Sequence, residues 1–313
     1  MNKSIVLNIC GVKSLGGLKV AKTAIESVQK SQYNLILLHN NNLPELSSRN
    51  TDFINIETNL KRFLHPYLNL FLSKENIYKI NNSEAIIHLG NFGFKTKNKS
   101  YTMIQNLLPF EENNIKNIIL KFFINKSFKQ SSFIIYQLDH VAKKINKRFH
   151  HKLIGIGEVK KITKGYNKEI GVISIQSNIK NKNTAFLNKV LGIMESEFPN
   201  LKITKVVSQE NINQTDSKSG KFINSLLEHN IYLHASNYET VGLPIYEASS
   251  NGLFVVGPEL EYMNNFDNTN SLKYIPGNVS SAVNAIKEVL NINLKTYNSL
   301  SYTENWDEVL KKI

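Results

Sequence analysis

Residues 239–248 read ETVGLPIYEA, and they follow the mainly apolar run IYLHAS at 231–236. Pro244 suits the first turn of a helix, because its missing backbone N–H would have no partner there. We expect that helix to end at Gly252, since glycine accepts the left-handed conformation of a helix cap. LFVVG at 253–257 is then typical of a second buried strand. The order strand, loop, helix, strand predicts an α/β domain with a parallel sheet.

Two glutamates flank this turn and indicate that it binds a ligand. Glu239 is expected in the loop at the carboxyl end of a strand, which is where open α/β sheets bind ligands. Glu247 is expected in the first turn of the helix, facing the same end of the sheet. The helix N-terminus offers unpaired N–H groups and a partial positive charge, worth roughly 0.3–1 kcal/mol to an anion. A phosphate on that helix end, with carboxylates accepting hydroxyls beside it, describes a site for a sugar nucleotide.

The stretch resembles the signature of the retaining family 4 glycosyltransferases of the GT-B fold, whose usual form is E-G-F-G-L-P-x-x-E-A. The resemblance implies that Glu239 contacts the donor sugar and that Glu247 holds the ribose of the nucleotide. It also implies that four backbone amides approach the sugar and the diphosphate, those of Thr240, Val241, Gly242 and Leu243. The alternative is a surface loop and helix that carry two unrelated glutamates.

The composition is that of a globular protein without a membrane span. The chain has 313 residues, 41% of them hydrophobic, which is enough for two domains with ordinary cores. No run approaches the ~18–20 apolar residues that a transmembrane helix requires, and the first residues lack the pattern of a signal peptide. Cys10 is the single cysteine, which excludes an intramolecular disulfide and a cysteine-rich metal site. We therefore expect a cytoplasmic protein.

The net charge of +13 favours anionic partners: nucleic acid, anionic lipid or phosphorylated small molecules. No RNP, zinc-finger or helix-turn-helix signature is present, so nucleic acid is not an expected partner. A helix predicted at 113–130 is more specific, because apolar residues at helical spacing alternate there with Lys116, Lys121, Lys126 and Lys129. Such a helix can lie peripherally on an anionic membrane surface. The alternative is a core-facing helix with a solvated lysine face.

The N-terminal half begins as a Rossmann-like domain does, with strand, glycine loop and helix. SIVLNICGV predicts the strand, and Gly16 and Gly17 open the helical spacing that follows. In the family that the chain resembles, such a pair lies at the interdomain cleft; the alternative is a tight turn. Two later strands end in polar residues that we expect on the acceptor side, namely His88, Asn91, Gln105 and Asn106. The family has a histidine at the position of Gln105, so that histidine's role is not carried over.

A charged run of low complexity, VKKITKGYNKE at 159–169, separates two series of alternating strands and helices. The pattern predicts two Rossmann-like, doubly wound α/β domains that face each other across a cleft, which is the GT-B arrangement. The predicted acceptor-side domain is 1–165, and the predicted nucleotide-sugar-binding domain is 166–298. Residues 299–313 resemble the family's closing helix, which returns to the first domain.

Stabilising a departing diphosphate requires cations or backbone donors aimed at the developing charge. No Asp-x-Asp pair occurs in the sequence, so we predict a metal-independent enzyme without a cofactor. In the family, an arginine and a lysine follow the first strand of the second domain. Lys182 matches the lysine, Ser177 stands at the arginine position, and Lys180 is the candidate substitute. Lysine cannot form the two parallel hydrogen bonds to phosphate that arginine forms. The alternative that the chain is a weakly active or silent enzyme therefore remains.

These observations predict a retaining glycosyltransferase that moves a sugar from a nucleotide sugar to a glycan or a polyprenyl-diphosphate-linked acceptor. The resemblance implies bacterial O-antigen or capsule synthesis at the inner face of the cell membrane. It also implies a transfer in which the leaving-group oxygen assists deprotonation of the acceptor, so Glu239 positions the sugar and is no nucleophile. Two alternatives remain: a silent nucleotide-sugar-binding partner subunit, and a glycoside hydrolase that uses both glutamates.

Overall fold

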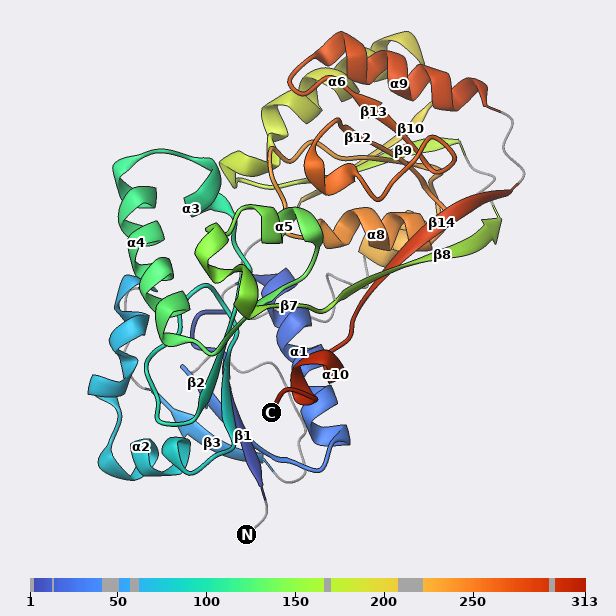
Figure 1. Cartoon of the computed structure of the whole chain (residues 1–313). Helices are drawn as coiled ribbons and strands as arrows, with labels where there is room; N and C mark the ends of the chain where they lie inside the picture. The colour runs from blue at the N-terminus through green and yellow to red at the C-terminus, as the bar shows by residue number, and fades with distance from the viewer. Residues whose placement is uncertain are drawn as a thin grey trace. The chain divides into compact units, whose positions relative to one another are not determined.

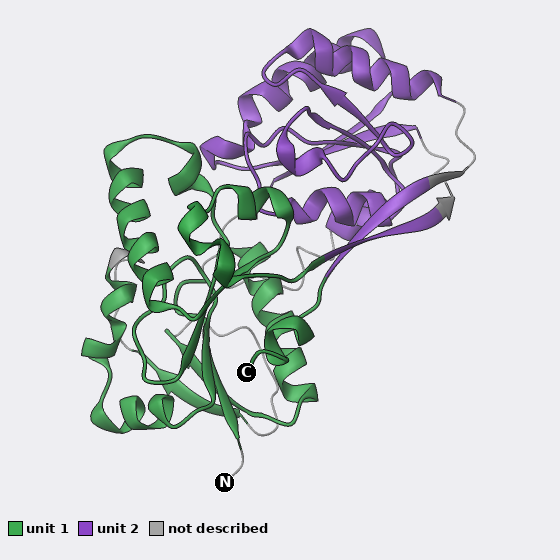
Figure 2. Cartoon of the chain, viewed as in Figure 1, with its two compact units in different colours: residues 1–157, 304–313 green, residues 158–303 purple. Residues whose placement is uncertain are grey.

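The computed structural model describes residues 3–12, 14–40, 51–56, 62–165, 170–207, 222–292 and 296–313. The chain divides into two compact units, coloured green and purple in Figure 2. Unit 1 contains residues 1–157 and 304–313, and unit 2 contains residues 158–303. The sequence-based boundaries were 165/166 and 298/299, whereas the chain passes between the units at 157/158 and 303/304.

Unit 1 is built on a parallel sheet with the strand order β3-β2-β1-β4-β5-β6-β7. The strands are β1 (Ser4–Asn8), β2 (Asn34–His39), β3 (Thr51–Asn55), β4 (Ala85–His88), β5 (Lys99–Met103), β6 (Phe133–Tyr136) and β7 (Leu153–Gly155). Each neighbouring pair is parallel, and Val6 of β1 lies between Ile36 of β2 and Ile86 of β4. The strand order reverses between β1 and β4, as it does in a Rossmann sheet.

Helices cover the sheet of unit 1, and Figure 1 shows them along the chain. They are α1 (Leu15–Lys30), η1 (Arg62–Phe71), α2 (Lys74–Asn81), α3 (Leu108–Glu111), α4 (Ile115–Gln130), α5 (Asp139–Lys143), η2 (Lys147–Lys152) and α10 (Asp307–Leu310). Leu68 of η1 and Ile80 of α2 pack on the β1, β2 and β4 side of the core. Ile124 and Phe128 of α4 pack beside Ile134 of β6. Burying these apolar side chains supplies the main driving force for folding.

Unit 2 has a second parallel sheet, with the order β10-β9-β11-β12-β13. Its strands are β9 (Gly171–Gln176), β10 (Lys202–Val207), β11 (Ile231–Leu233), β12 (Phe254–Pro258) and β13 (Ser271–Tyr274). Its helices are η3 (Lys180–Lys182), α6 (Thr184–Glu197), α8 (Leu243–Ser250), η5 (Glu261–Met263) and α9 (Val279–Asn291). The core joins Val172, Ile231 and Val256 of the sheet to Leu187 of α6 and Ile286 of α9. The order reverses between β9 and β11, so this sheet also has a ligand-binding switch point.

The predicted linker is wrong in its described part, because 158–165 lie in a strand. β8 (Gly157–Gly165) pairs with β14 (Thr296–Glu304) in a two-stranded sheet, which runs beside α8 in Figure 1. Residues 166–169 of the predicted linker lie outside the described residues. Extended backbone is favoured here by three β-branched residues, Val159, Ile162 and Thr163. The lysines between them made the run look like a linker.

The closing segment is a strand followed by one helical turn, where the sequence predicted a single helix from 299. The Ser- and Tyr-rich run up to Glu304 favours the extended backbone of β14, and α10 follows it. Trp306 is buried, and its indole Nε1–H donates to Thr23 Oγ1 (3.1 Å) and Glu304 Oε2 (3.2 Å). Thr23 belongs to α1, and residues 304–313 are part of unit 1.

Candidate functional site

Two loops meet where the strand order of unit 2 reverses. One loop (177–183) follows β9, and the other (234–242) follows β11, its parallel neighbour. Asn181 joins them: its Nδ2 donates to the Tyr238 carbonyl (2.8 Å), and its Oδ1 accepts from the Tyr238 N–H (3.1 Å). The Asn237 N–H donates to the Asn181 carbonyl (3.0 Å). This amide therefore fixes the spacing of the two loops at the carboxyl edge of the sheet.

Lys182 and Glu239, one from each loop, form the ion pair at the centre of this site. The Lys182 Nζ lies 2.5 Å from Glu239 Oε1, and the two side chains are 25% and 13% exposed. Burial alone would raise the pKa of the Glu239 carboxyl, but Lys182 and His234 hold that pKa below its ordinary value. Glu239 is therefore an anion at neutral pH, and a cation and an anion are held together where the sheet offers a binding edge.

His234 is a third member of this site, and it is not among the residues predicted from the sequence. Its ring is buried at the end of β11, with Nε2 3.6 Å from Glu239 Oε1 and Nδ1 3.3 Å from the Tyr232 hydroxyl. Burial lowers the pKa of His234 to about 4, so the ring is neutral at physiological pH. The signal was present: Tyr232 and His234 are polar and two residues apart in an apolar run, which puts both on one face of a strand.

The positions expected to help bind a diphosphate after β9 differ in accessibility. Ser177 is buried, and its hydroxyl accepts from the Ile179 N–H (3.2 Å) while its own N–H donates to Thr184 Oγ1 (3.0 Å). This serine therefore shapes the turn into α6. Lys180 is exposed, whereas Lys182 points to Glu239. Of the two lysines, Lys182 is the one that the fold holds at the site.

The ETVGLPIYEA stretch forms the predicted loop and helix. Gly242 has a φ of 72°, and a Cβ there would come within 2.7 Å of Ile245 Cδ1, so both backbone and space favour glycine. α8 begins at Leu243 and ends before Gly252, which has a φ of 93°. Thr240 is half-buried and Val241 is buried in the loop that leads to this helix.

Glu247 lies in the second turn of α8, where the sequence predicted the first turn, because the helix begins at Leu243. Its side chain is half-buried, and its carbonyl accepts from Asn251 Nδ2 (2.8 Å). Burial and the charges of both Glu239 and Glu247 raise the pKa of Tyr232 far above its ordinary value. The two glutamates of the motif thus act electrostatically on one buried hydroxyl.

The acceptor-side residues predicted in unit 1 are partly structural. His88 is fully buried: Asn8 Nδ2 lies 2.9 Å from its Nδ1, and the ring of Phe94 packs edge-on against it. The Asn91 side chain accepts from the N–H groups of Gln105 (2.8 Å) and Asn106 (3.0 Å), and its Nδ2 donates to the Asn106 carbonyl (2.6 Å). Asn91 therefore braces the loop after β5. Gln105 is half-buried and Asn106 is exposed, so these two can meet a ligand.

Gly16 and Gly17 belong to the first turn of α1, where the sequence predicted a glycine loop before the helix. Ser14 caps the helix by accepting from the Gly17 N–H (3.1 Å). A Cβ on Gly17 would lie 3.0 Å from Val12 Cγ1 and 3.5 Å from Gln105 Oε1. Close packing explains this glycine, and it brings the first turn of α1 next to the loop after β5.

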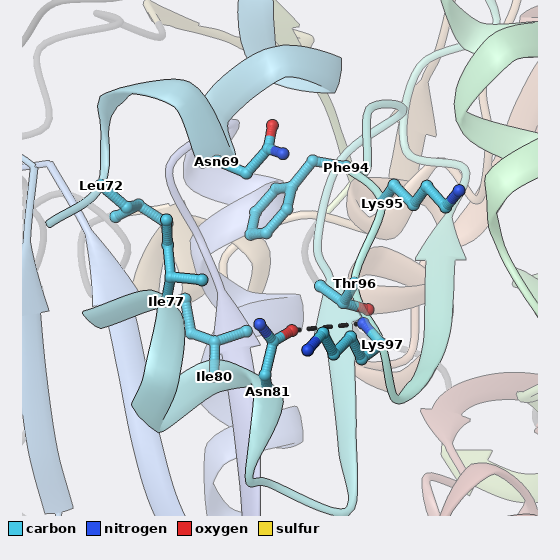
Figure 3. A pocket seen from close by; sticks show the side chains of 9 residues that line it. All are labelled: Asn69, Leu72, Ile77, Ile80, Asn81, Phe94, Lys95, Thr96 and Lys97. Atoms are coloured by element: carbon cyan, nitrogen blue, oxygen red, sulfur yellow. Dashed lines mark hydrogen bonds between the residues drawn. The ribbon is translucent and has the colours of Figure 1, made fainter. Parts of the chain in front are cut away.

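Unit 1 also has a pocket of about 240 Å³, drawn in Figure 3. Leu72, Ile77, Ile80 and Phe94 form its apolar wall, and Asn69, Asn81, Thr96, Lys95 and Lys97 complete its lining. In the figure the Lys97 N–H donates to Asn81 Oδ1 (3.2 Å). The residues predicted for the site do not line it.

The described ranges contain neither a metal-binding cluster nor a membrane-spanning helix. No three side chains of histidine, cysteine, aspartate or glutamate gather there as a metal ion would need. No helix in those ranges is both long enough and apolar enough to cross a membrane.

Comparison with known proteins gives structural likeness only. No family model matches the sequence, and no curated protein sequence does. WaaG, a glycosyltransferase involved in lipopolysaccharide biosynthesis, has a TM-score of 0.67 at 10% identity over 92% of this chain and 90% of its own. Anabaena HepE, solved with UDP and glucose, has a TM-score of 0.62 at 11% identity over the same shares. S. aureus TarM has a TM-score of 0.52 at 17% identity. That match covers 70% of this chain and 50% of TarM.

These likenesses and the two parallel sheets assign the chain to the GT-B fold, with two Rossmann-like domains. The fold class inferred from the sequence is therefore confirmed. The candidate site lies at the switch point of the second of these domains, between β9 and β11.

Proposed function

We propose that the chain is a retaining glycosyltransferase that transfers a sugar from a nucleotide-sugar donor to a glycan or lipid-linked oligosaccharide acceptor. The observation that carries the proposal is the partly buried Lys182–Glu239 pair at the switch point of unit 2, with Glu247 of α8 acting together with Glu239 on the buried Tyr232 hydroxyl. The structural neighbours support it, because HepE was solved with UDP and glucose and WaaG is named a glycosyltransferase. A single GT-B fold serves many sugars, so donor and acceptor stay open.

Each side chain has a role in this proposal. Lys182 neutralises the diphosphate as it departs, since a fixed cation next to the developing charge lowers the barrier. Glu239 accepts hydrogen bonds from the sugar hydroxyls, Glu247 accepts them from the ribose, and the loop amides from Thr240 to Leu243 approach the phosphates. The leaving-group oxygen takes the proton of the acceptor hydroxyl while the new glycosidic bond forms on the same face of the sugar. No metal ion and no cofactor enter this scheme.

We place the reaction in bacterial surface-polysaccharide assembly, O-antigen or capsule, as a family 4 enzyme would act. A second candidate is a silent subunit that binds nucleotide sugar, and one observation favours it. Ser177, at the position where the family has an arginine, is buried in a turn and offers no cation. Turnover separates the two candidates, because a silent subunit binds the donor without releasing nucleotide.

The test is a panel of UDP-, GDP-, ADP- and dTDP-sugars with a polyprenyl-diphosphate-linked acceptor, scored by nucleotide release and by direct binding. We expect Glu247→Ala to weaken donor binding about 10- to 100-fold, the loss of a hydrogen bond to a charged group worth about 1.5–3 kcal/mol. Glu288→Ala, an exposed glutamate on α9, is the matched control and should bind as the wild type does. Equal binding by Glu247→Ala and wild type would contradict the donor site.

The helix predicted to meet a membrane is α4, and several of its apolar residues are exposed. Ile115, Ile118 and Phe122 are 78%, 59% and 66% exposed, while Ile124 and Phe128 are buried. Lys116, Lys121 and Lys129 are exposed in the same helix, and Lys126 donates to the Tyr67 hydroxyl (2.5 Å). An exposed apolar surface with lysines around it suits the interface of an anionic bilayer. We propose that α4 holds the protein peripherally on the cytoplasmic face of the cell membrane.

Binding to vesicles tests this membrane surface. We expect sedimentation with phosphatidylglycerol vesicles at low salt, and weaker binding at high salt, because each basic residue near the surface contributes about 1 kcal/mol. Replacing Ile118 and Phe122 with Asn should abolish it, while Leu227→Asn, at a site in unit 2 that is 59% exposed, should not. Replacing the four lysines at 116, 121, 126 and 129 without loss of binding would contradict the electrostatic part.

A further inference from the structure

The His234 imidazole has a nitrogen with no hydrogen bond, aimed at the carboxylate of the site. Nε2 is fully buried, makes no hydrogen bond in the structure, and lies 3.6 Å from Glu239 Oε1. An N–H···O bond to a carboxylate is about 2.7–3.2 Å long, so the two atoms face each other just beyond bonding distance. A buried ring nitrogen without a partner is costly, which calls for an explanation.

Glu239 already has a closer partner than His234, the Lys182 ammonium. Lys182 Nζ and His234 Nε2 both face the same oxygen, Oε1, and the lysine is the closer at 2.5 Å. The proposed function gives Lys182 a second task, because a diphosphate carries more negative charge than one carboxylate and competes for the same ammonium. When Lys182 turns to the diphosphate, the buried Glu239 carboxylate is left with less compensation.

We propose that His234 is a positioning residue that takes over Glu239 when Lys182 moves to the diphosphate of the donor, by donating its Nε2–H to Oε1. This inference rests on the proposed function. The exchange keeps the carboxylate fixed toward the sugar while the cation moves to the leaving group. A catalytic hydrogen bond that is long in the free protein and shortens in the complex is a common arrangement.

The surroundings of His234 suit the tautomer that carries its proton on Nε2, the nitrogen that faces Glu239. The Tyr232 hydroxyl lies 3.3 Å from Nδ1 and can donate to it, which leaves the ring proton on Nε2. The edge of the Tyr262 ring packs against the imidazole at 5.7 Å between centroids, and the Tyr274 hydroxyl donates to the His234 carbonyl (2.7 Å). Glu239, Lys182 and these tyrosines are the titratable groups that face the ring. The imidazole is therefore held by tyrosines while its Nε2 faces Glu239.

The exchange can be tested without a donor, because Lys182→Met removes the competing ammonium. We expect the His234 Nε2–H proton signal to move downfield in the NMR spectrum of this variant and to exchange more slowly with water, as a bond to Glu239 forms. Lys202→Met, which removes the lysine of the exposed pair with Glu228, is the matched control and should leave the signal in place. An unchanged His234 signal in Lys182→Met would overturn the inference.

Donor binding gives a second readout. UDP-glucose and the other sugars of the panel are titrated into wild type, His234→Leu and His234→Gln, all first shown to unfold at similar temperatures. We expect His234→Leu to bind at least 10-fold more weakly and His234→Gln, which keeps an N–H donor, to stay within about threefold. The penalty of His234→Leu should vanish when Glu239 is also replaced with Gln. Equal affinities for Leu and Gln would overturn the inference; no binding by wild type would overturn the proposed function, while the NMR result still decides the exchange.

Discussion

Acidification from pH 6.5 to about 4 is expected to remove several kcal/mol of folding stability, through two buried histidines. Burial and, to a smaller extent, the nearby His65 lower the pKa of His88 to about 3. Burial also lowers the pKa of His234 to about 4. The His88 ring is fully buried, with the Asn8 amide and the Phe94 ring against it, so a charge on it would not be solvated. Both rings are therefore neutral in the folded protein at pH values where the unfolded chain protonates them.

The sign follows from proton linkage. Each histidine binds its proton near pH 6.5 when unfolded and only near pH 3 or 4 when folded, so the unfolded state binds more protons in between. The free energy of unfolding then falls as the pH drops below 6.5, by up to ~1.4 kcal/mol per pH unit for each ring. Down to the folded pKa values this amounts to about 5 kcal/mol for His88 and about 3 kcal/mol for His234. Glu239 adds to the loss only below its unfolded pKa, near 4.3.

Urea unfolding between pH 7.5 and 4.5 measures this effect. In His88→Gln the unfolding free energy should fall less steeply with pH than in wild type, because one of the two rings with the most strongly lowered pKa values is gone. His151→Gln, at an exposed histidine, is the control and should follow the wild-type curve. A wild-type free energy that stays flat across this range would show that neither ring is held neutral by burial.

Much of the second domain was predictable because its signals are local. ETVGLPIYEA specifies a loop and a helix through Gly242 and Pro244, and Gly252 ends the helix; each acts within a few residues of itself. Parallel strands flank this helix, so Glu239 is placed at a sheet edge by the order of elements alone. The contact between Lys182 and Glu239 was not predicted, because the adjacency of β9 and β11 is not visible in the sequence; the resemblance implied only that both residues serve the donor.

The errors arose where distant segments decide the structure. β8 has a lysine-rich sequence typical of a linker, and only its pairing with β14 makes it a strand. A pairing partner more than a hundred residues away leaves no local pattern. Gly17 illustrates the same point. A larger residue there would press against the side chains of Val12 and Gln105, whereas the sequence suggested a loop.

The site was harder to predict than the fold because residue type does not reveal burial. His88 and Asn91 follow a strand and are polar, yet one is buried against Asn8 and the other braces the loop after β5. His234 is the reverse case: it lies at the site, but the sequence suggested only that it belongs to an apolar strand. Alternation along that strand, with polar residues at Tyr232 and His234, was the one signal that could have found it.

Lys182→Met is expected to lower the free energy of unfolding at pH 7 by about 3 kcal/mol, the lower end for breaking a buried ion pair. The methionine fills the space of the lysine stem but leaves the Glu239 carboxylate, which is 13% exposed, without its cation. The loss of unfolding free energy comes from the Glu239 carboxylate, whose charge is no longer compensated. Lys202→Met breaks a pair with Glu228 at a similar distance (2.8 Å), but both side chains are exposed and screened by solvent, so this variant should unfold much as the wild type does.

Two further measurements identify the cause of that loss. Lys182→Met/Glu239→Met should recover most of the stability, because removing both charges removes the desolvation problem. The deficit should also shrink on acidification: the pKa of Glu239 is depressed in the folded wild type, so its pairing stabilises above the unfolded pKa near 4.3 and is lost as the pH falls through the folded value. A double variant no more stable than Lys182→Met would mean that lost packing, and not the buried charge, causes the effect.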